Sequence, residues 1–187
     1  MTSEMKSTLP FLFYWLNRVP VDVKSVLDLG AGRGVVGAML QVYREPPNLQ
    51  AVEIHPPYAE FAKSYYNHVT VGDALEALKP FPSKSFDVVT CFEMIEHLPK
   101  DKGSELIREM ERIGRIAFIS TPGKFFPQPE YDGNVHQKHL SAWSAGEFRR
   151  MGYHVRGFGR AQWWFGLIPS VLTPGLCGNI FAWKIQS

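Results

Sequence analysis

Cysteine is scarce in this 187-residue sequence, which contains only Cys91 and Cys177. Cys91 lies inside an apolar run, and Cys177 lies in a stretch rich in glycine and proline. Disulfide-stabilised secreted folds and cysteine-based zinc modules both need several cysteines at set spacings. The sequence therefore excludes a disulfide framework and a cysteine-based zinc site.

An excess of charge of one sign is also lacking, because 20 Lys and Arg residues accompany 18 Asp and Glu residues and the net charge is +2. Nucleic-acid-binding domains usually carry a strongly basic surface, so no nucleic-acid partner is expected. A long apolar segment is missing too. Residues 163–178 are apolar but contain two prolines, and they fall short of the roughly 20 residues that span a bilayer. We expect this stretch to be core or a pocket for a lipid-like molecule, with weak peripheral membrane contact as the alternative.

The beginning of the sequence shows no targeting signal. Its first seven residues are polar, and the apolar residues 9–16 lack the small residues of a signal-peptide cleavage site. We therefore expect a soluble, cytoplasmic protein.

The chain alternates short apolar runs with amphipathic segments of helical length, which is typical of an α/β fold. The predicted strands cover residues 25–30, 49–54, 68–73, 86–92, 115–121, 153–160 and 179–185, and the predicted helices cover 35–44, 57–66, 73–78, 104–113 and 144–151. Ser104 and Ser144 stand where helix N-caps belong. The pattern predicts one domain over 1–187 with a doubly wound, mostly parallel, seven-stranded Rossmann-like sheet and an antiparallel last strand. Residues 1–24 are expected to form a helical lid, and 122–143 and 161–178 are expected to be loops beside a substrate.

The stretch VLDLGAGRG at residues 26–34 follows a predicted strand and opens a predicted helix. Its glycines allow a tight turn and close backbone approach to a ligand. A dinucleotide-binding fold would place a third glycine where Val35 stands, which disfavours a nicotinamide-dependent oxidoreductase. Asp28 lies two residues before Gly30, and its carboxylate would repel a pyrophosphate but attract an amine or a cation.

Two more acids end the next two predicted strands. Glu53 lies nineteen residues after Gly34 and could grip both hydroxyls of a ribose, and Asp73 could accept from an adenine amine. Because ligands of open α/β sheets bind at the carboxyl ends of the strands, these acids predict a binding crevice there.

DLGAGRG, Glu53, GDA and FDVVTCFEMIEHL together resemble class I S-adenosylmethionine-dependent methyltransferases over about residues 25–155. The resemblance implies S-adenosylmethionine (AdoMet) as cofactor. It places Asp28, Gly30 and Gly32 at the methionine end, Glu53 at the ribose, Asp73 and Ala74 at the adenine, and Phe92 and Glu93 along the cofactor, with Ala31 and Ile54 as further cofactor-binding residues. The segment CFEMIEHL is similar to small-molecule methyltransferases that include quinone-biosynthesis enzymes, in which His97 would face the transfer site. His97 could act as a general base or simply cap or pack a turn.

Two motifs with other possible meanings are interpreted as structural. HPPY at 55–58 resembles the motif of some nitrogen methyltransferases but follows the wrong strand, so we expect a turn and a helix start. Cys91 lies within a strand, so it is expected to be a core residue and not the nucleophile of a cytosine methyltransferase.

The segment after the fifth predicted strand carries His136, His139 and Trp143, which we expect to reach the acceptor pocket or to pack a lid. The two histidines offer only two ligands, and no third cysteine or carboxylate has matching spacing, so no metal is expected. The sequence thus predicts a methyltransferase that uses AdoMet to methylate O, N or C of a small-molecule or lipid/glycan-like acceptor, with His97, His136 and His139 as candidate catalytic residues. The alternative is a non-catalytic AdoMet-binding scaffold.

Overall fold

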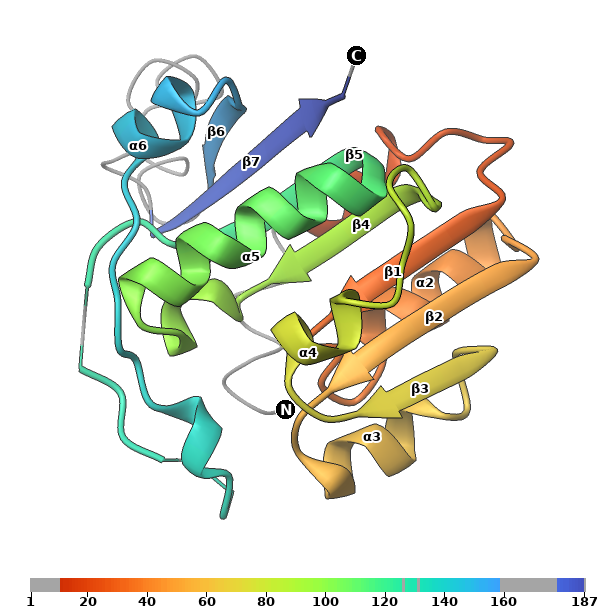
Figure 1. Ribbon diagram of the computed structural model, residues 1–187, viewed down its shortest axis with the longest axis horizontal. Helices are drawn as coiled ribbons and strands as arrows, with labels where there is room; N and C mark the ends of the chain where they lie inside the picture. Colours follow the sequence, from red (N-terminus) through yellow and green to blue (C-terminus); the bar gives the residue numbers. More distant parts are fainter. Residues whose placement is uncertain (1–10, 126, 131, 159–177, 187) are drawn as a thin grey trace. The chain divides into compact units, whose positions relative to one another are not determined.

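The computed structural model describes residues 11–125, 127–130, 132–158 and 178–186 (Figure 1). The strands are β1 Ser25–Leu29, β2 Asn48–Glu53, β3 His68–Val71, β4 Phe86–Phe92, β5 Gly114–Pro122, β6 His154–Phe158 and β7 Asn179–Ile185. The helices are α2 Val35–Tyr43, α3 Pro56–Ala62, α4 Ala74–Leu78, α5 Lys100–Ile113 and α6 Ala145–Arg150, and the short 3-10 helices are η1 Ile95–His97 and η2 Val135–Gln137. Residues 11–16 are also helical.

The strands form one seven-stranded sheet in the order β3-β2-β1-β4-β5-β7-β6. β1 pairs in parallel with β2 and with β4, β2 pairs in parallel with β3, and β7 pairs antiparallel with β6. The order reverses direction at β1, because the chain moves outward to β3 and then returns to β4 on the other side. This is the predicted doubly wound, mostly parallel sheet with an antiparallel last strand, and its switch point is where such sheets bind ligands.

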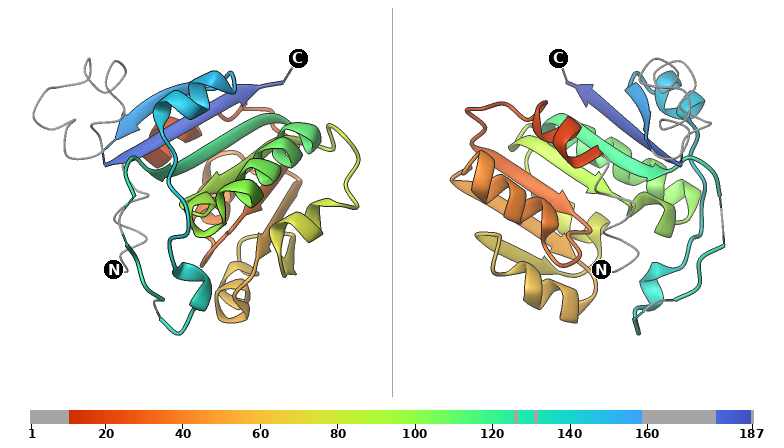
Figure 2. Two further views of the ribbon diagram at one scale, coloured as in Figure 1. Left: turned by 60° about the vertical axis from the view of Figure 1, so that its left-hand side comes forward. Right: turned by 180° about the vertical axis from the view of Figure 1, so that it is seen from behind.

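The chain divides into two compact units. Unit 2 comprises Leu16–Cys91, Ser104–Ala117 and Ile185–Ser187. In this unit α4 and the part of α5 from Ser104 onward lie on the face of the sheet shown in Figure 1, whereas α2 lies on the opposite face, which the right view of Figure 2 shows. Right-handed crossovers place helices on both faces in this way, and the middle strands are buried from both sides.

Unit 1 comprises Met1–Trp15, Phe92–Gly103 and Phe118–Lys184. Its core is a cluster of aromatic rings. Phe11 packs edge-on against Phe92, with ring centroids 5.1 Å apart, and stacks on Phe181 at 5.5 Å. Trp15 also meets the Phe92 ring edge-on, at 5.3 Å. The helix before β1 is thus anchored by aromatic packing, which the sequence analysis did not identify.

The helix starts confirm one of the two N-cap predictions and the predicted start of α3. Ser144 caps α6 in a reciprocal capping box with Glu147, and Pro56 opens α3 as the HPPY interpretation required. The prediction that Ser104 is an N-cap was wrong, because α5 begins at Lys100 and the amide of Gly103 already donates to the Pro99 carbonyl at 2.9 Å. Gly103 is a poor helix former, so the sequence pattern placed the helix start after it.

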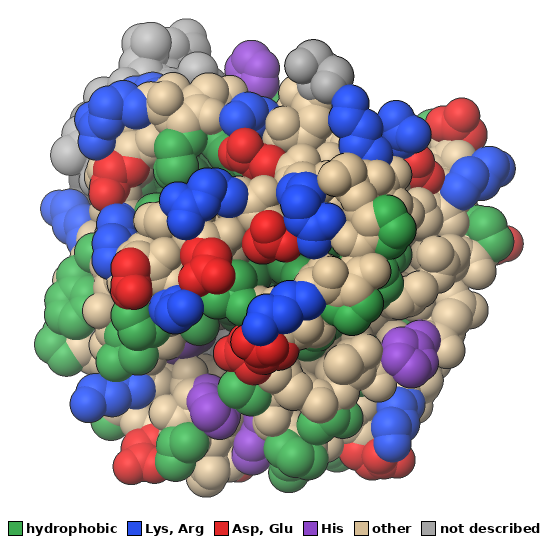
Figure 3. All heavy atoms as spheres, in the orientation of Figure 1, with side chains coloured by type: hydrophobic (Ala, Val, Ile, Leu, Met, Phe, Trp, Pro, Cys, Tyr) green, Lys and Arg blue, Asp and Glu red, His purple; other side chains and the backbone are tan. Residues whose placement is uncertain are grey.

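Two predicted features lie partly or wholly outside the described residues. The predicted lid over 1–24 is described only from residue 11, and the loop predicted over 161–178 is described only at Gly178. Among the helices that the structure describes, none has the length and hydropathy needed to cross a membrane. On the face shown in Figure 3, basic and acidic side chains are interspersed, consistent with the net charge of +2.

Candidate functional site

The glycine turn after β1 brings backbone amides to the carboxyl end of the strand. The amides of Gly30 and Ala31 both donate to the carbonyl of Val52, at 2.9 and 3.2 Å. Gly34 has a φ of 92°, and a Cβ there would lie 2.8 Å from the Tyr65 ring. Only glycine satisfies both the left-handed backbone and this close approach.

Glu53 fixes this turn to the end of β2. One carboxylate oxygen accepts from the Gly32 amide at 2.8 Å, and the other accepts from the His55 amide at 2.8 Å. The side chain is only 5% exposed. Because each carboxylate oxygen can accept more than one hydrogen bond, Glu53 can hold the turn and still accept from a ligand's hydroxyl groups.

Asp28 lies deeper in unit 2, at 2% exposure, and two hydroxyl groups contact its carboxylate. The Thr90 hydroxyl donates to one carboxylate oxygen at 2.6 Å, and the Tyr66 hydroxyl donates to the other at 2.5 Å. Tyr66 in turn accepts from the Gly37 amide at 2.9 Å. Asp28 therefore joins β1 to β4 and, through Tyr66, to α2.

Burial raises the pKa of Asp28 to about 6, although its hydrogen bonds with Thr90 and Tyr66 act in the opposite direction. Desolvation also raises the pKa of Tyr66, and the neighbouring Asp28 carboxylate raises it further. The tyrosine therefore keeps its proton and remains the donor in this pair.

Asp73 lies two residues after the end of β3 and directly precedes α4. Its side chain accepts from the Glu76 amide at 3.1 Å, which makes it the N-cap of the helix, and it is exposed at the same time. Ala74 is buried, and Ile54 after β2 is half-buried. All cofactor residues predicted between Asp28 and Ala74 thus belong to unit 2, at strand ends or in the loops that follow them.

Glu93, just after β4, has a strained backbone, with a φ of 50° in the left-handed region. Its amide donates to the Ser120 carbonyl at 3.0 Å, while its carboxylate accepts from the Ser120 hydroxyl at 2.7 Å and from the Asn179 amide group at 2.8 Å. Burial raises the pKa of Glu93 to about 7. Strain of this kind concentrates at functional sites, and the cofactor role of Glu93 stays a prediction.

The structure brings two of the three selected histidines together and leaves the third apart. The rings of His97 and His139 lie 4.9 Å apart between centroids, and Glu96 offers a carboxylate beside them. His136 is exposed on η2 and is not part of this group. Burial lowers the pKa of His97 to about 4, so its imidazole is neutral at pH 7.

Three residues of these arrangements were not selected from the sequence: Tyr66, Thr90 and Glu96. Glu96 had a readable signal, since it directly precedes His97 and follows Glu93 by three residues. Tyr66 and Thr90 had none, because each contacts Asp28 from a different part of the chain.

Comparison with known proteins agrees with this fold. Residues 27–116 match the family model described as a methyltransferase domain. The chain is 34% identical over 99 residues to a ubiquinone biosynthesis O-methyltransferase of Albidiferax ferrireducens, covering 48% of this chain and 38% of that protein. It is 27% identical over 146 residues to a probable S-adenosylmethionine-dependent methyltransferase of Mycobacterium tuberculosis, covering 72% of this chain and 52% of that protein.

Among solved structures, a SAM-dependent methyltransferase from Archaeoglobus fulgidus superposes with a TM-score of 0.67 at 15% identity, covering 94% of this chain and 93% of that one. The chain spans about half or less of the length of the two curated relatives. The family-model match over residues 27–116 and the named relatives make this chain similar to S-adenosylmethionine-dependent methyltransferases, and the solved structure shares its fold.

Proposed function

We propose that this protein transfers the methyl group of AdoMet to an O, N or C atom of a small-molecule or lipid/glycan-like acceptor. The observation that carries the proposal is the position of the Glu53 carboxylate at the end of β2, where it accepts from the Gly32 amide of the glycine turn and from the His55 amide. This arrangement presents backbone amides and a buried carboxylate at the switch point of the sheet.

The cofactor contacts follow from where each acid lies. Glu53 would accept from the ribose hydroxyls, and Asp73 would accept from the adenine amine with Ala74 beside the ring. Ile54 would be a further cofactor-binding residue. Asp28 would act at the methionine end through its charge. Its hydrogen bonds would also hold β1, the strand that the glycine turn follows. Phe92 and Glu93 would line the cofactor from the end of β4.

The transfer itself is an in-line displacement. A lone pair of the acceptor atom attacks the methyl carbon, the carbon–sulfur bond breaks with its electrons remaining on sulfur, and the acceptor proton leaves to a base or to water. Because a sulfonium is a good leaving group, positioning supplies much of the rate. Neutral His97 or its neighbour His139 could receive the proton, and we keep His136 as a further candidate on the acceptor side.

The named activity of the ubiquinone relative supports an oxygen atom of a small aromatic molecule as the first acceptor to test. Calorimetric titration should show AdoMet binding by the wild type and at least tenfold weaker binding by Asp28→Ala and Glu53→Ala. A matched surface variant, Glu60→Gln, replaces an exposed acid of α3 that pairs with Lys63, and it should bind like the wild type.

Release of S-adenosylhomocysteine with a panel of phenols would measure turnover. The His136→Ala and His139→Ala variants should keep the cofactor affinity and lose turnover. Absence of AdoMet binding by the wild type, or undiminished binding by Asp28→Ala and Glu53→Ala, would refute the proposal. Binding without turnover on any acceptor would favour a cofactor-binding scaffold.

A further inference from the structure

Glu96, His97 and His139 form a compact group of potential metal ligands in unit 1. One ligand atom from each residue lies within 4.8 Å of those of the other two. Glu96 and His97 are the last two residues of η1, whereas His139 comes from the segment after η2, more than forty residues later. Glu96 is 3% exposed and His139 is 8% exposed, so two of the three side chains are more than nine-tenths buried.

Backbone hydrogen bonds hold the two segments against each other. The amides of Leu140 and Ser141 both donate to the Glu96 carbonyl, at 2.8 and 3.0 Å. The two donor residues directly follow His139 in the chain. The two hydrogen bonds fix its position relative to η1 independently of any contact between the side chains.

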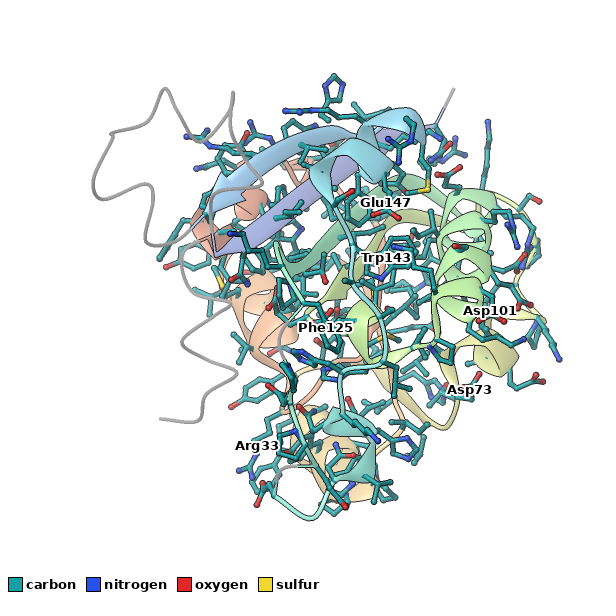
Figure 4. All side chains as sticks on the ribbon, turned by 90° about the vertical axis from the view of Figure 1, so that its left-hand side faces the viewer. Arg33, Asp73, Asp101, Phe125, Trp143 and Glu147 are labelled. Atoms are coloured by element: carbon teal, nitrogen blue, oxygen red, sulfur yellow. The ribbon has the colours of Figure 1, made fainter. Side chains whose placement is uncertain are left out.

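Further contacts anchor the segment that carries His139. Lys100 lies 3.6 Å above the centre of the Trp143 ring and forms an ion pair with Glu147 at 2.7 Å. A Cβ on Gly103 would come within 2.5 Å of Trp143, so the indole fills the space beside the first turn of α5. Figure 4 labels Trp143 and Glu147 in this part of unit 1.

Hydrogen bonds with neighbouring groups orient two of the potential metal ligands, Glu96 and His97. The Thr121 hydroxyl donates to one oxygen of the Glu96 carboxylate at 3.0 Å. The Nδ1 atom of His97 lies 3.2 Å from the Lys138 carbonyl oxygen, and a hydrogen bond there selects the tautomer with its proton on Nδ1. The lone pair of His97 is then on Nε2, which is the usual arrangement of a metal-ligating histidine.

We propose that Glu96, His97 and His139 bind one divalent transition-metal ion, with Zn²⁺ as the ion that best fits the donors. Two imidazoles and one carboxylate are the ligand set of three-ligand zinc sites that keep a coordination position open. An ionised carboxylate as deeply buried as Glu96 also needs a cation or a proton beside it. Zinc–ligand bonds of about 2.0–2.2 Å would draw the three side chains together by roughly 1 Å.

The open coordination position of the metal ion gives the site a role in binding the methyl acceptor. This role rests on the proposed methyltransferase function. The open position would take a hydroxyl or phenol oxygen of the acceptor, which narrows the acceptor class from O, N or C to oxygen. Coordination lowers the pKa of such a hydroxyl. Its proton then leaves to water, and the oxygen attacks the methyl carbon as the carbon–sulfur bond breaks.

Metal binding can be tested without cofactor or acceptor. Protein freed of metal by chelator dialysis should bind one Zn²⁺ per chain in calorimetry, and Co²⁺ should give a visible absorption band of stoichiometric intensity. Glu96→Gln, His97→Ala and His139→Ala should each weaken Zn²⁺ binding at least tenfold. The matched control is His154→Ala, since His154 is an exposed histidine of the same unit that stacks on Trp183, and it should bind within twofold of the wild type.

Circular dichroism and AdoMet titration on the same preparations distinguish a failure of the metal site from a failure of the proposed methyltransferase function. The three ligand variants should retain the wild-type spectrum and AdoMet affinity. If His139→Ala fails to fold, His139→Gln keeps a polar side chain at the position and replaces it in the comparison. No stoichiometric Zn²⁺ binding, or equal affinity in all folded variants, would overturn the site. Methyl transfer to a phenol that is equally fast with and without the ion would overturn its role with the acceptor.

Discussion

The carboxylate of Glu53 accepts a hydrogen bond from the backbone amide of Gly32 at 2.8 Å, joining the end of β2 to the turn that follows β1. The contact spans 21 residues of sequence. Glycine has little conformational preference because it lacks a Cβ atom, and it loses the most backbone freedom on folding. The contact with Glu53 therefore stabilises a turn that its glycines alone would not order.

Glu53→Gln should therefore weaken AdoMet binding at least tenfold while leaving the fold intact. The glutamine side chain has only one acceptor oxygen, so it can replace only one of the two carboxylate oxygens. Its NH₂ group would then face the backbone N–H of Gly32 or of His55, and two donors cannot form a hydrogen bond with each other. Calorimetry measures the affinity, and amide hydrogen exchange should show faster exchange at Gly32 and His55. In the control Glu60→Gln both quantities should remain at wild-type values. Protected Gly32 and His55 amides in Glu53→Gln would show that the turn orders itself without this carboxylate.

Asp28 should make the stability of the protein depend on pH. Its folded pKa of about 6 lies above its ordinary value of 3.8, so the folded state binds the proton more tightly than the unfolded state. The associated stability is fully present below pH 3.8 and is lost as the pH rises through about 6. The difference corresponds to about 3 kcal/mol.

Comparison with Asp28→Asn isolates this effect. The free energy of unfolding, from urea titrations between pH 4 and pH 8, should fall with rising pH more steeply in the wild type than in the variant. The difference should change mainly below about pH 6 and then level off. A constant offset between the two curves would reflect packing alone, so parallel curves over the whole range would contradict the raised pKa.

The sheet could be predicted from the sequence because its strands are short apolar runs that end in polar residues. The acids at the ends of β1 and β2 could be selected for the same reason, since parallel strands bring their carboxyl ends to one edge. Each of these inferences needs only local pattern and chain order. Ser144 and Asp73 were likewise recognised as residues that start helices, because an N-cap acts on amides two or three residues away.

The parts that the sequence did not reveal depend on contacts between distant residues. The hydrogen bond from Tyr66 to Asp28 could not be predicted, because the two residues lie 38 positions apart in the chain. No metal was expected at His136 and His139 for want of a third ligand of matching spacing, and the structure places Glu96 and His97 beside His139 although more than forty residues separate them in the chain. The start of α5 was misplaced because Gly103 is needed to admit Trp143, a requirement that no local pattern expresses.

Tyr66→Phe should destabilise the protein more at high pH than at low pH. The substitution removes a buried hydroxyl that donates to Asp28 and accepts from Gly37, and an unsatisfied buried group costs about 1–3 kcal/mol. Because the Tyr66 hydrogen bond lowers the pKa of Asp28, it favours the ionised carboxylate, and its loss matters most where Asp28 is charged.

Urea unfolding at pH 5 and pH 8 measures this difference. The matched control is Tyr65→Phe, since Tyr65 is the preceding residue and is 38% exposed, and it should change the free energy of unfolding by less than about 0.5 kcal/mol at both values. An equal loss for Tyr66→Phe at pH 5 and pH 8 would mean that the hydroxyl does not act through the charge of Asp28.

Two glycine-to-alanine substitutions in helices should have effects of opposite sign. In α6, a Cβ on Gly146 would meet no heavy atom closer than 3.5 Å, so Gly146→Ala should stabilise the protein by about 0.5–1 kcal/mol through helix propensity. In α2, a Cβ on Gly37 would lie 2.6 Å from two atoms of the Tyr66 ring and 3.0 Å from the Tyr65 carbonyl oxygen. Overpacking of this kind costs about 1–3 kcal/mol, which outweighs the gain in propensity.

Gly37→Ala should also displace Tyr66 and so disturb the hydrogen bonds that reach Asp28. We expect a net loss of about 1–2 kcal/mol in the free energy of unfolding, together with weaker AdoMet binding. Thermal or urea unfolding of both variants measures the first effect, and calorimetry measures the second. Gly146→Ala serves as the control, because it changes the same residue type in a helix that does not contact Tyr66 through any hydrogen bond of the described residues. If Gly37→Ala were as stable as Gly146→Ala, then Tyr66 would have room to move, and its hydroxyl would not be fixed between α2 and Asp28.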